Sequence, residues 1–433
     1  MKNKIKLFFR NNQEINLDFS AEKISSDGGL IISEKIERQT RLIYNFSRLL
    51  PDRRHKSYIH HSTYKMLKQR VFTLNQGYED CNDEKYLRND PLLQELSDGR
   101  TVSQPTMSRF ENSLDKEDIC RMSEYFVDNW IQSIPAKKET VIIDVDSTDI
   151  ETHGRQQLSM FNDFYSETMY NPLMFHDGDT GQLILPVLRA GNVHTSLGFT
   201  ALLKGIVERL RARRPKIKII IRGDSGFSGA SFYKLADEYD LRFCVGIAGN
   251  AVLQALVKRE EECIAGWFYK YGEDYQYFTD KIEYKAGSWD KPQYCYAKIE
   301  STRHGINKRF FCSNIYGLTA KELYMDFYVK RGDRSENRIK ELKCMCFSGR
   351  LSCHEFYANY FRLFLSSLSY EMFRILREKI KATGNTEASK WQVANIRLFL
   401  LKVGAVITKK VKSLTVSFPR TYTSKKLLTE MLI

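Results

Sequence analysis

The feature of this sequence that most constrains its fold is a β-branched run that ends in acidic residues, Val141-Ile142-Ile143-Asp144-Val145-Asp146. Because the run is short and rich in Val and Ile, it predicts a strand rather than a helix. The following segments predict a hairpin, a helix, a strand, a helix and a strand at residues 173–188, 195–213, 217–221, 231–239 and 242–247. This order predicts a mixed sheet flanked by helices, which is an α/β architecture.

Residues 250–326 have a different pattern from the segments on either side. They are rich in Tyr, Phe and Trp, and short apolar runs such as Trp267–Tyr271 alternate with turn residues. This pattern predicts an all-β insertion. After it we expect a strand at Tyr324–Val329 and a helix at Ser335–Cys346. Further helices are expected at 36–135, 352–381 and 389–405.

Composition narrows the class of protein. The 433 residues carry a formal net charge of +14, and a basic excess points to a polyanionic partner, most commonly nucleic acid. The uncharged apolar runs, among them Phe364–Tyr370, are far shorter than the roughly 20 residues that cross a bilayer. Met1–Arg10 is basic without the apolar segment of a secretory signal, and the nine cysteines include no C-x2-C pair. We therefore expect reduced thiols in a cytoplasmic protein.

Two segments outside the α/β region carry groups suited to DNA. In residues 102–114, Ser103 predicts a helix N-cap and Pro105 an early helical position, so Arg109 and small polar neighbours project from one helix. The alternative is an ordinary capped helix without a role in binding. Residues 403–429 contain no acidic residue, and we expect phosphate contacts from Lys409, Lys410 and Lys412.

Three carboxylates stand where open α/β sheets assemble their sites. Asp146 ends the first strand, Asp224 follows the strand at 217–221, and Glu336 lies early in a helix. Each acid alone has an ordinary alternative role as a helix or turn cap. Together they would repel one another, and a hard divalent cation with oxygen ligands relieves that repulsion, so they predict a site for Mg²⁺ or Mn²⁺. Asp144 faces the same side of the strand as Asp146, so either one could be the first metal ligand.

The helix that carries the third acid also carries groups suited to DNA. Glu336, Lys340 and Lys343 recur at i, i+4 and i+7, which is one face of a helix, and Tyr328 and Arg331 precede them. We expect the basic groups to grip backbone phosphates. Two metal ions about 4 Å apart would activate a water or a 3′-hydroxyl for in-line attack at phosphorus. The alternative for Glu336 and Lys340 is a surface ion pair.

Three blocks of sequence carry these groups: Asp-Ser-Thr at 146–148, Arg-Gly-Asp-Ser-Gly-Phe at 222–227, and Tyr-x2-Arg-Gly followed by Glu-Asn-Arg-Ile-Lys-Glu-Leu-Lys within 328–343. Their pattern resembles the DDE transposases of bacterial insertion sequences, in the branch with a Tyr-Arg-Glu-Lys signature around the third acid. The resemblance covers about residues 100–350. It implies an RNase H-like catalytic core, two Mg²⁺ ions for which Mn²⁺ can substitute, cut-and-paste movement of DNA, and a homodimer that bridges two element ends. It places the catalytic triad on Asp146, Asp224 and Glu336.

One departure from the family's pattern concerns the signature arginine. Relatives place three residues between Arg and Glu, whereas four separate Arg331 from Glu336, so Arg334 is an alternative for that role. The long gap before the third acid fits relatives with a β domain there, in which an aromatic side chain stacks on a displaced base. Trp267 and Trp289 are the candidates, and packing in the insertion's own core is the alternative for both.

These inferences divide the chain into five segments. They are a mainly helical DNA-binding region at 1–135, the first part of the RNase H-like core at 136–249, the β-rich insertion at 250–326, the second part of the core with C-terminal helices at 327–405, and a basic tail at 406–433. We expect a transposase that binds element ends and acts on double-stranded DNA in the bacterial cytoplasm, associated with the nucleoid when bound. The alternatives are an RNase H-like nuclease that cuts without rejoining and a domesticated DNA-binding protein without activity.

Overall fold

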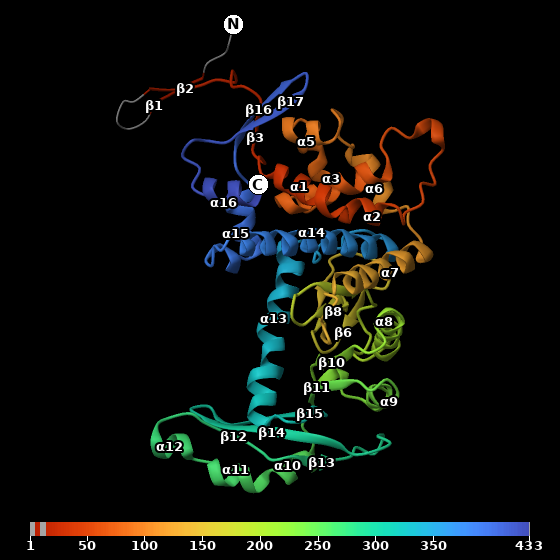
Figure 1. The fold of residues 1–433 in the computed structure, drawn as a ribbon, viewed down its shortest axis with the longest axis vertical. Helices are drawn as coiled ribbons and strands as arrows, with labels where there is room; N and C mark the ends of the chain where they lie inside the picture. Colours follow the sequence, from red (N-terminus) through yellow and green to blue (C-terminus); the bar gives the residue numbers. More distant parts are fainter. Residues whose placement is uncertain (1–4, 9–13, 433) are drawn as a thin grey trace. The chain divides into compact units, whose positions relative to one another are not determined.

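The computed structural model describes residues 5–8 and 14–432, and the side chains of residues 333–335 lie outside the described part. Most of the basic stretch Met1–Arg10 also lies outside it. The chain forms two compact units, one of Glu111–Glu371 and one of Met1–Phe110 with Met372–Ile433 (Figure 1).

The unit Glu111–Glu371 is built on one large mixed sheet. Among the described residues, nine strands join in the order β12-β14-β15-β11-β10-β4-β8-β9, with β13 beside β14. β8 is antiparallel to β4 and β9, whereas β10 is parallel to β4 and β11 is parallel to β10. This is the strand order of an RNase H-like core, so the predicted mixed sheet is confirmed. The strands are β4 Thr140–Ser147, β8 Leu173–Asp177, β9 Leu183–Val187, β10 Lys218–Gly223, β11 Arg242–Ile247, β12 Tyr275–Phe278, β13 Ile282–Tyr284, β14 Gln293–Thr302 and β15 Gly305–Ser313.

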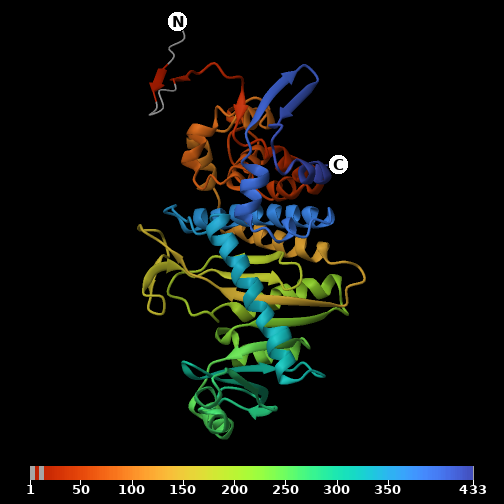
Figure 2. The ribbon, with the colours of Figure 1, turned by 90° about the vertical axis from the view of Figure 1, so that its left-hand side faces the viewer.

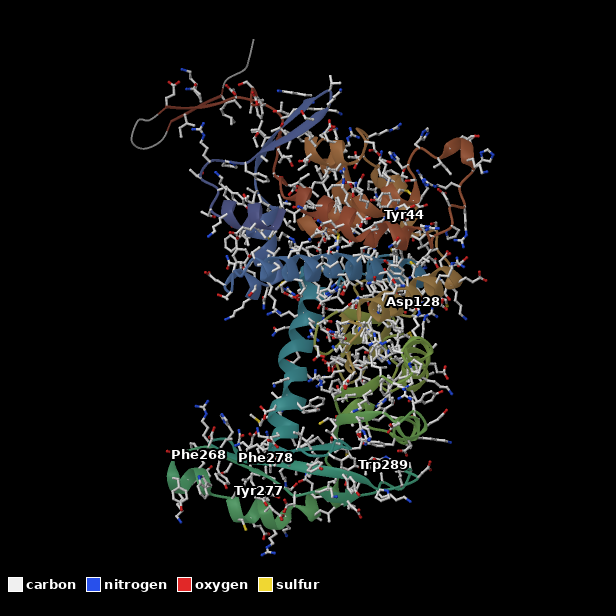
Figure 3. The ribbon with its side chains drawn as sticks, in the orientation of Figure 1. Tyr44, Asp128, Phe268, Tyr277, Phe278 and Trp289 are labelled. Carbon is white, nitrogen blue, oxygen red and sulfur yellow. The ribbon has the colours of Figure 1, made fainter. Side chains whose placement is uncertain are left out.

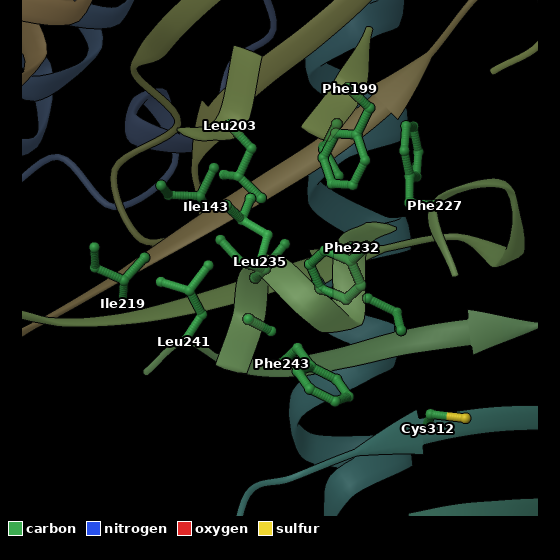
Figure 4. Close-up of a cluster of buried hydrophobic side chains, with 14 of the residues drawn as sticks. Ile143, Phe199, Leu203, Ile219, Phe227, Phe232, Leu235, Leu241, Phe243 and Cys312 are labelled. Carbon is green, nitrogen blue, oxygen red and sulfur yellow. The ribbon is translucent and has the colours of Figure 1, made fainter. Parts of the chain in front are cut away.

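Side chains alternate across this sheet and divide it into two faces. On β4 and β10 the odd-numbered residues, such as Val145 and Ile221, belong to the large apolar core. The even-numbered residues, such as Asp144 and Arg222, point to the opposite face. Helices α7 (Lys116–Ser133), α8 (Phe199–Arg213) and α9 (Ala230–Glu238) cover the first face. A group of aromatic side chains packs there (Figure 4), namely Phe199, Phe227, Phe232 and Phe243.

One long helix crosses the second face of the sheet (Figure 2). It consists of a π-helical stretch at Glu322–Tyr328, α13 at Val329–Lys340 and a second π-helical stretch at Glu341–Met345. The predicted strand at Tyr324–Val329 is therefore wrong. Tyr324 and Tyr328 lie four residues apart, and both pack on Phe311 of β15, which is helical rather than strand spacing.

The segment 250–326 differs from the predicted all-β insertion in two respects. It begins with helices α10 (Ala251–Leu256), α11 (Lys258–Ile264) and α12 (Trp267–Tyr271). Its long strands β14 and β15 also continue the core sheet, because β15 pairs with β11. Glycines in the left-handed region bound α12 on both sides. As a helix, α12 places Trp267 and Tyr271 four residues apart, and Trp267 stacks on Tyr275 with 4.3 Å between ring centroids.

A small three-stranded sheet continues the β4–β8 pair beyond the end of β4. β5 (Ile150–Glu151) pairs with β7 (Glu167–Tyr170), and β7 pairs with β6 (Met160–Asn162). No sequence prediction covered these strands, because they are too short for periodicity to be read. The β6–β7 hairpin, yellow in Figure 2, stands out from the core sheet.

The other unit, which joins Met1–Phe110 to Met372–Ile433, is mainly helical. Helix α6 (Gln104–Glu111) begins after Ser103 and has Pro105 as its second residue. The basic tail folds into the hairpin of β16 (Ala405–Lys410) and β17 (Ser413–Ser417), followed by α16 (Lys425–Leu432). The remaining elements are β1 Ile5–Phe8, β2 Glu14–Leu17, β3 Ile24–Ser25, α1 Leu30–Thr40, α2 Leu42–Ser47, α3 Thr63–Gln76, α4 Glu84–Leu87, α5 Pro91–Leu96 and α15 Val393–Ile396, and α14 Phe356–Ala382 contributes to both units. Across the described part of the chain, no helix has the length and apolar character needed to span a membrane.

We expect Trp130→Ala to destabilise the unit Glu111–Glu371 by about 3–5 kcal/mol. The indole of Trp130 is fully buried on α7, and its Nε1 donates a hydrogen bond to Asp177 Oδ2 at 2.9 Å. The alanine variant loses both the packing and this hydrogen bond. Urea unfolding measures the change, and the exposed Tyr316→Ala is the control. A loss below about 1 kcal/mol would contradict this placement of Trp130.

Candidate active site

The parallel pairing of β4 with β10 places two of the predicted acids side by side. In the register Asp144 pairs with Arg222, so Asp146 and Asp224 lie two residues further along at the ends of neighbouring strands. Both acids are even-numbered and face the side that α13 covers. Burial raises the pKa of Asp146 to about 6, and the negative charge of Asp224 adds to this rise. The two carboxylates are therefore close enough to repel each other.

An arginine of α13 compensates part of that repulsion. Arg331 Nη1 donates to Asp146 Oδ2 at 2.8 Å, and its guanidinium also lies over the ring of Tyr328. Burial opposes the charge of Arg331, but the carboxylates of Asp146 and Asp224 outweigh burial and raise its pKa. Asp224 Oδ1 accepts a hydrogen bond from the backbone N–H of Gly226 at 2.8 Å. The site thus holds two acids and one arginine at the carboxyl ends of two parallel strands.

Asp144, the alternative first ligand, is committed to a buried ion pair. Its side chain is 1% exposed. Arg222 Nε and Nη2 donate to its two oxygens at 2.6 and 2.9 Å, and Arg338 Nη1 of α13 lies 3.5 Å from Oδ2. Arg222 also donates to the carbonyl oxygen of Phe327. With both oxygens occupied, Asp144 joins the sheet to the long helix, and Asp146 is the acid left at the strand end.

The structure does not bring Glu336 to the other two acids. Arg331 and Arg338 are seven residues apart, two helical turns, and both point at the sheet. Glu336 follows Arg331 by five residues, which is about 140° around an α-helix, and its side chain is exposed. Within the described residues, no three His, Cys, Asp or Glu side chains form a group that could hold a metal ion. The extra residue between Arg331 and Glu336 turns the Glu336 side chain away from the two aspartates. With only three residues between them, Arg331 and Glu336 would lie on the same face of the helix.

The other predicted residues of this unit have mixed placements. Tyr328 packs between Phe311 and Tyr324, and burial raises its pKa. Lys340 is exposed, whereas Lys343 forms an ion pair with Asp149. The side chain of Arg334 lies outside the described residues.

The two tryptophans proposed to stack on a base are not equivalent. Trp289, labelled in Figure 3, is 6% exposed. It packs between Tyr233 and Tyr284, which supports the core alternative. Trp289 is therefore too deeply buried to stack on a base. Trp267 is half-buried against Tyr271 and Tyr275.

The predicted basic residues of the other unit lie on its surface. Arg109, Lys410 and Lys412 are exposed, and Lys409 is exposed while paired with Glu95 at 2.6 Å.

Sequence reasoning missed the residues that hold the site together. Arg222 and Arg338 were not singled out, although Arg222 has a signal in the sequence. Arg222 directly follows the apolar run Ile219–Ile221, and a charge at such a buried position requires a partner. Tyr165, on the β6–β7 hairpin, was also missed; burial raises its pKa, and the charges of Asp149, Asp146 and Asp224 add to the rise.

The side chains of Asp146 and Asp224 are chemically suited to bind a divalent cation. Asp146 and Asp224 supply oxygen ligands from two neighbouring strands, and a cation removes the repulsion that helps to raise the pKa of Asp146. Arg331 is the positive charge that meets this need in the structure. A cation between the acids would have to displace the contact between Arg331 and Asp146.

A family model for the transposase DDE domain group 1 matches residues 9–433. The chain belongs to this family. It is therefore a DNA transposase, as the sequence predicted, and the nuclease and strand-transfer chemistry of DDE transposases generally depends on divalent metal ions. A comparison with curated protein sequences finds no match.

Solved structures similar to this transposase share little sequence with it. The piggyBac transposase synaptic complex with hairpin DNA is 13% identical with a TM-score of 0.45, and the match covers 88% of this chain and 82% of that one. Endonuclease V of Ciona intestinalis bound to a 23mer DNA is 12% identical with a TM-score of 0.25, covering 53% and 99%. The Mos1 transposase paired-end complex is 12% identical with a TM-score of 0.18, covering 38% and 57%. At these TM-scores the similarities add nothing to the family assignment.

We expect Asp144→Ala to destabilise the transposase by about 3–5 kcal/mol, because it leaves the buried Arg222 without its partner. Urea unfolding measures the loss. Lys258→Ala, which removes an exposed ion pair with Glu262, is the matched control and should change stability by less than about 0.5 kcal/mol. If both variants behave alike, Asp144 is not the buried anchor that the structure shows.

Proposed function

We propose that this transposase excises its DNA element by cutting at the element's ends and joins the freed ends to target DNA. Asp146, Asp224 and Glu336 act as the metal-binding acids. The observation that carries the proposal is the parallel register of β4 and β10, which places Asp146 and Asp224 at neighbouring strand ends on the face crossed by α13. Short inverted repeats in the DNA that flanks the gene would identify the substrate.

Each residue of the site has a separate role in the proposed phosphoryl transfer. When bound, two divalent cations, Mg²⁺ or Mn²⁺, would activate the attacking oxygen and stabilise charge on the leaving oxygen. Asp146 and Asp224 would hold them from the ends of two neighbouring strands. Arg331, once released from Asp146, is placed to hold a phosphate oxygen of the scissile strand. Asp144 and Arg222 keep the sheet and the long helix in register.

Glu336 completes the site only if the middle of α13 rewinds. The helix is π-helical on both sides of Val329–Lys340, and a π-turn absorbs one extra residue per turn. Moving such a turn into the segment between Arg331 and Glu336 would rotate Glu336 toward Asp146. We therefore propose that binding of metal and DNA selects this rewound helix, which compensates the one-residue departure from the family spacing.

DNA binding is proposed to involve both units. Lys340 and Lys343 stand on the long helix beside the site, and Lys343 reaches a phosphate after leaving Asp149. On the other unit, Arg109 and the lysines of the β16–β17 hairpin are exposed. A homodimer that brings two element ends together completes the proposal.

We expect Asp146→Asn, Asp224→Asn and Glu336→Gln each to lower strand cleavage at least a hundredfold. Loss of a metal ligand removes about 3 kcal/mol or more of transition-state stabilisation, which is two powers of ten in rate. A labelled duplex of the element end measures cleavage, and a pre-cut end with a target plasmid measures joining. Asp240→Asn, at an exposed position, is the control.

Three outcomes would contradict different parts of the proposal. Full cleavage by Glu336→Gln would exclude Glu336 as a metal ligand, and with it the rewound helix. The assignment of Asp146 and Asp224 would not be affected. Full cleavage by Asp224→Asn would overturn the site itself. Cleavage without joined product by the wild type would favour the nuclease alternative.

Lys340→Ala should weaken binding to end DNA and lower the slope of log K against log salt by about 1, because each phosphate contact releases about one counterion. Fluorescence anisotropy at several salt concentrations measures the slope. Lys258→Ala, which removes an exposed lysine of α11, should leave the slope unchanged. Equal slopes for Lys340→Ala and wild type would show that Lys340 makes no phosphate contact.

A further inference from the structure

The hairpin of β16 and β17 has two chemically different faces. In its register Thr408 pairs with Thr415, and Lys410 pairs with Ser413. Directly opposite residues of an antiparallel pair lie on the same side, so these four side chains share one face, which Ser417 extends toward the base of the hairpin. All five are exposed. We call this set the outer face: it carries four hydroxyl groups and one ammonium group.

The opposite face holds the hairpin on its own unit. Ile407 is 6% exposed, and its backbone N–H donates to the carbonyl oxygen of Lys23 at 2.8 Å. Lys409 lies on the same face as Ile407 and forms an ion pair with Glu95 of α5 at 2.6 Å. At its base β16 also pairs with β3. The hairpin, blue in Figure 2, extends from this attachment away from the helices of its unit.

The charges around the hairpin favour a polyanionic ligand. Residues 403–429 contain no acid, and the acids that border the hairpin are Glu22 and Glu95. Glu95 pairs with a lysine of the opposite face, and Glu22 is followed in the chain by another lysine. Lys410 on the outer face and Lys412 in the turn form no ion pair within the described part of the chain. Uncompensated positive charge therefore lies at the outer end of the hairpin.

The hydroxyl groups of the outer face are available to a ligand. Among the described residues, no hydrogen bond involves the side chains of Thr408, Ser413, Thr415 or Ser417. A serine or threonine hydroxyl both donates and accepts, so the outer face offers both kinds of contact in one row. Phosphates only accept hydrogen bonds, whereas the edges of bases present donors and acceptors. The outer face is therefore suited to base edges.

The shape of the hairpin selects the groove of the DNA. Paired strands lie about 4.8 Å apart, and the major groove, about 12 Å wide, admits a two-stranded ribbon, whereas the minor groove is only about 6 Å wide. We propose that the β16–β17 hairpin enters the major groove at the element's end and that its outer face reads base edges there. Lys410 and Lys412 contact the bordering phosphates, and the fully exposed Val411 of the turn contacts thymine methyl groups. The assignment rests on the proposed function, because it takes DNA of the element end as the ligand.

Isosteric substitution tests base readout. Thr408→Val combined with Thr415→Val removes two hydroxyls and keeps the β-branched shape that suits a strand. With the full-length protein in EDTA, this double variant should bind the end duplex about tenfold more weakly than wild type and a scrambled duplex equally well. Fluorescence anisotropy measures both affinities. Thr386→Val, at an exposed threonine of the same unit, is the control and should match wild type. Wild-type affinity of the double variant for the end duplex, or equal losses on both duplexes, would overturn the proposal.

Modified base pairs test which groove is read. In a first end duplex, inosine·cytosine replaces A·T and diaminopurine·thymine replaces G·C, which changes the major-groove groups and keeps the minor-groove ones. In a second, the two replacements are interchanged, which changes the minor groove only. The advantage of wild type over the double variant should vanish on the first duplex and persist on the second. The reverse result would place the hairpin in the minor groove and contradict the assignment.

The lysines give an independent test through salt. Lys410→Ala combined with Lys412→Ala should weaken binding of end and scrambled duplexes by the same factor and lower the slope of log K against log salt by about 2. Lys381→Ala combined with Lys390→Ala, at exposed positions of the same unit, is the matched control and should keep the wild-type slope. An unchanged slope in the Lys410 and Lys412 variant would show that the hairpin does not lie on DNA.

The proposed function and the role of the hairpin fail in different ways. If wild type neither prefers the end duplex to the scrambled one nor cuts it, the proposed function fails. If wild type does both while the threonine variant keeps the full preference, the proposed function stands and only the hairpin is excluded as the reader.

Discussion

The arrangement of this transposase depends on the parallel register between β4 and β10. That register pairs Asp144 with Arg222 and thereby sets Asp146 and Asp224 at neighbouring strand ends. Because side chains alternate along a strand, the odd-numbered apolar residues of both strands pack into the core, while the opposite face carries Asp144, Asp146, Arg222 and Asp224. A shift of one residue would bury the acids among the phenylalanines and expose the core face. The hydrophobic core and the candidate active site therefore specify the same register.

Two ion pairs of different kinds meet on that face. The pair of Asp144 with Arg222 is buried and bidentate, and it joins the strands to the long helix through Phe327 and Arg338. The pair of Arg331 with Asp146 lies at the strand end, where a cation and DNA would compete for both partners. The pair of Asp144 with Arg222 holds the strands and the helix together. The contact between Arg331 and Asp146 must break when metal and DNA bind. The β6–β7 hairpin extends from the same strand end, because β5 and β7 continue the pairing of β4 with β8.

The central sheet could be predicted because its strands and helices are long enough for the spacing of their apolar residues to be recognised in the sequence. Asp146 and Asp224 could be found because each follows an apolar strand. The long helix was misread at Tyr324–Val329, where aromatic residues suit a strand locally but pack with helical spacing. The small sheet at 150–170 was missed, since strands of two to four residues carry no periodicity. Glu336 could be located on the helix but not oriented, because one extra residue turns a side chain by about 100°.

The central claim is that Asp146 and Asp224 together bind the divalent cations of the site, and Mn²⁺ binding followed by electron paramagnetic resonance tests it most directly. Wild type should bind Mn²⁺ in competition with Mg²⁺. Asp146→Asn and Asp224→Asn should each weaken that binding at least tenfold, and the loss in the double variant should differ from the sum of the two single losses, because residues that act on one site are non-additive. Wild-type affinity in either single variant, or losses that simply add in the double variant, would contradict the shared site.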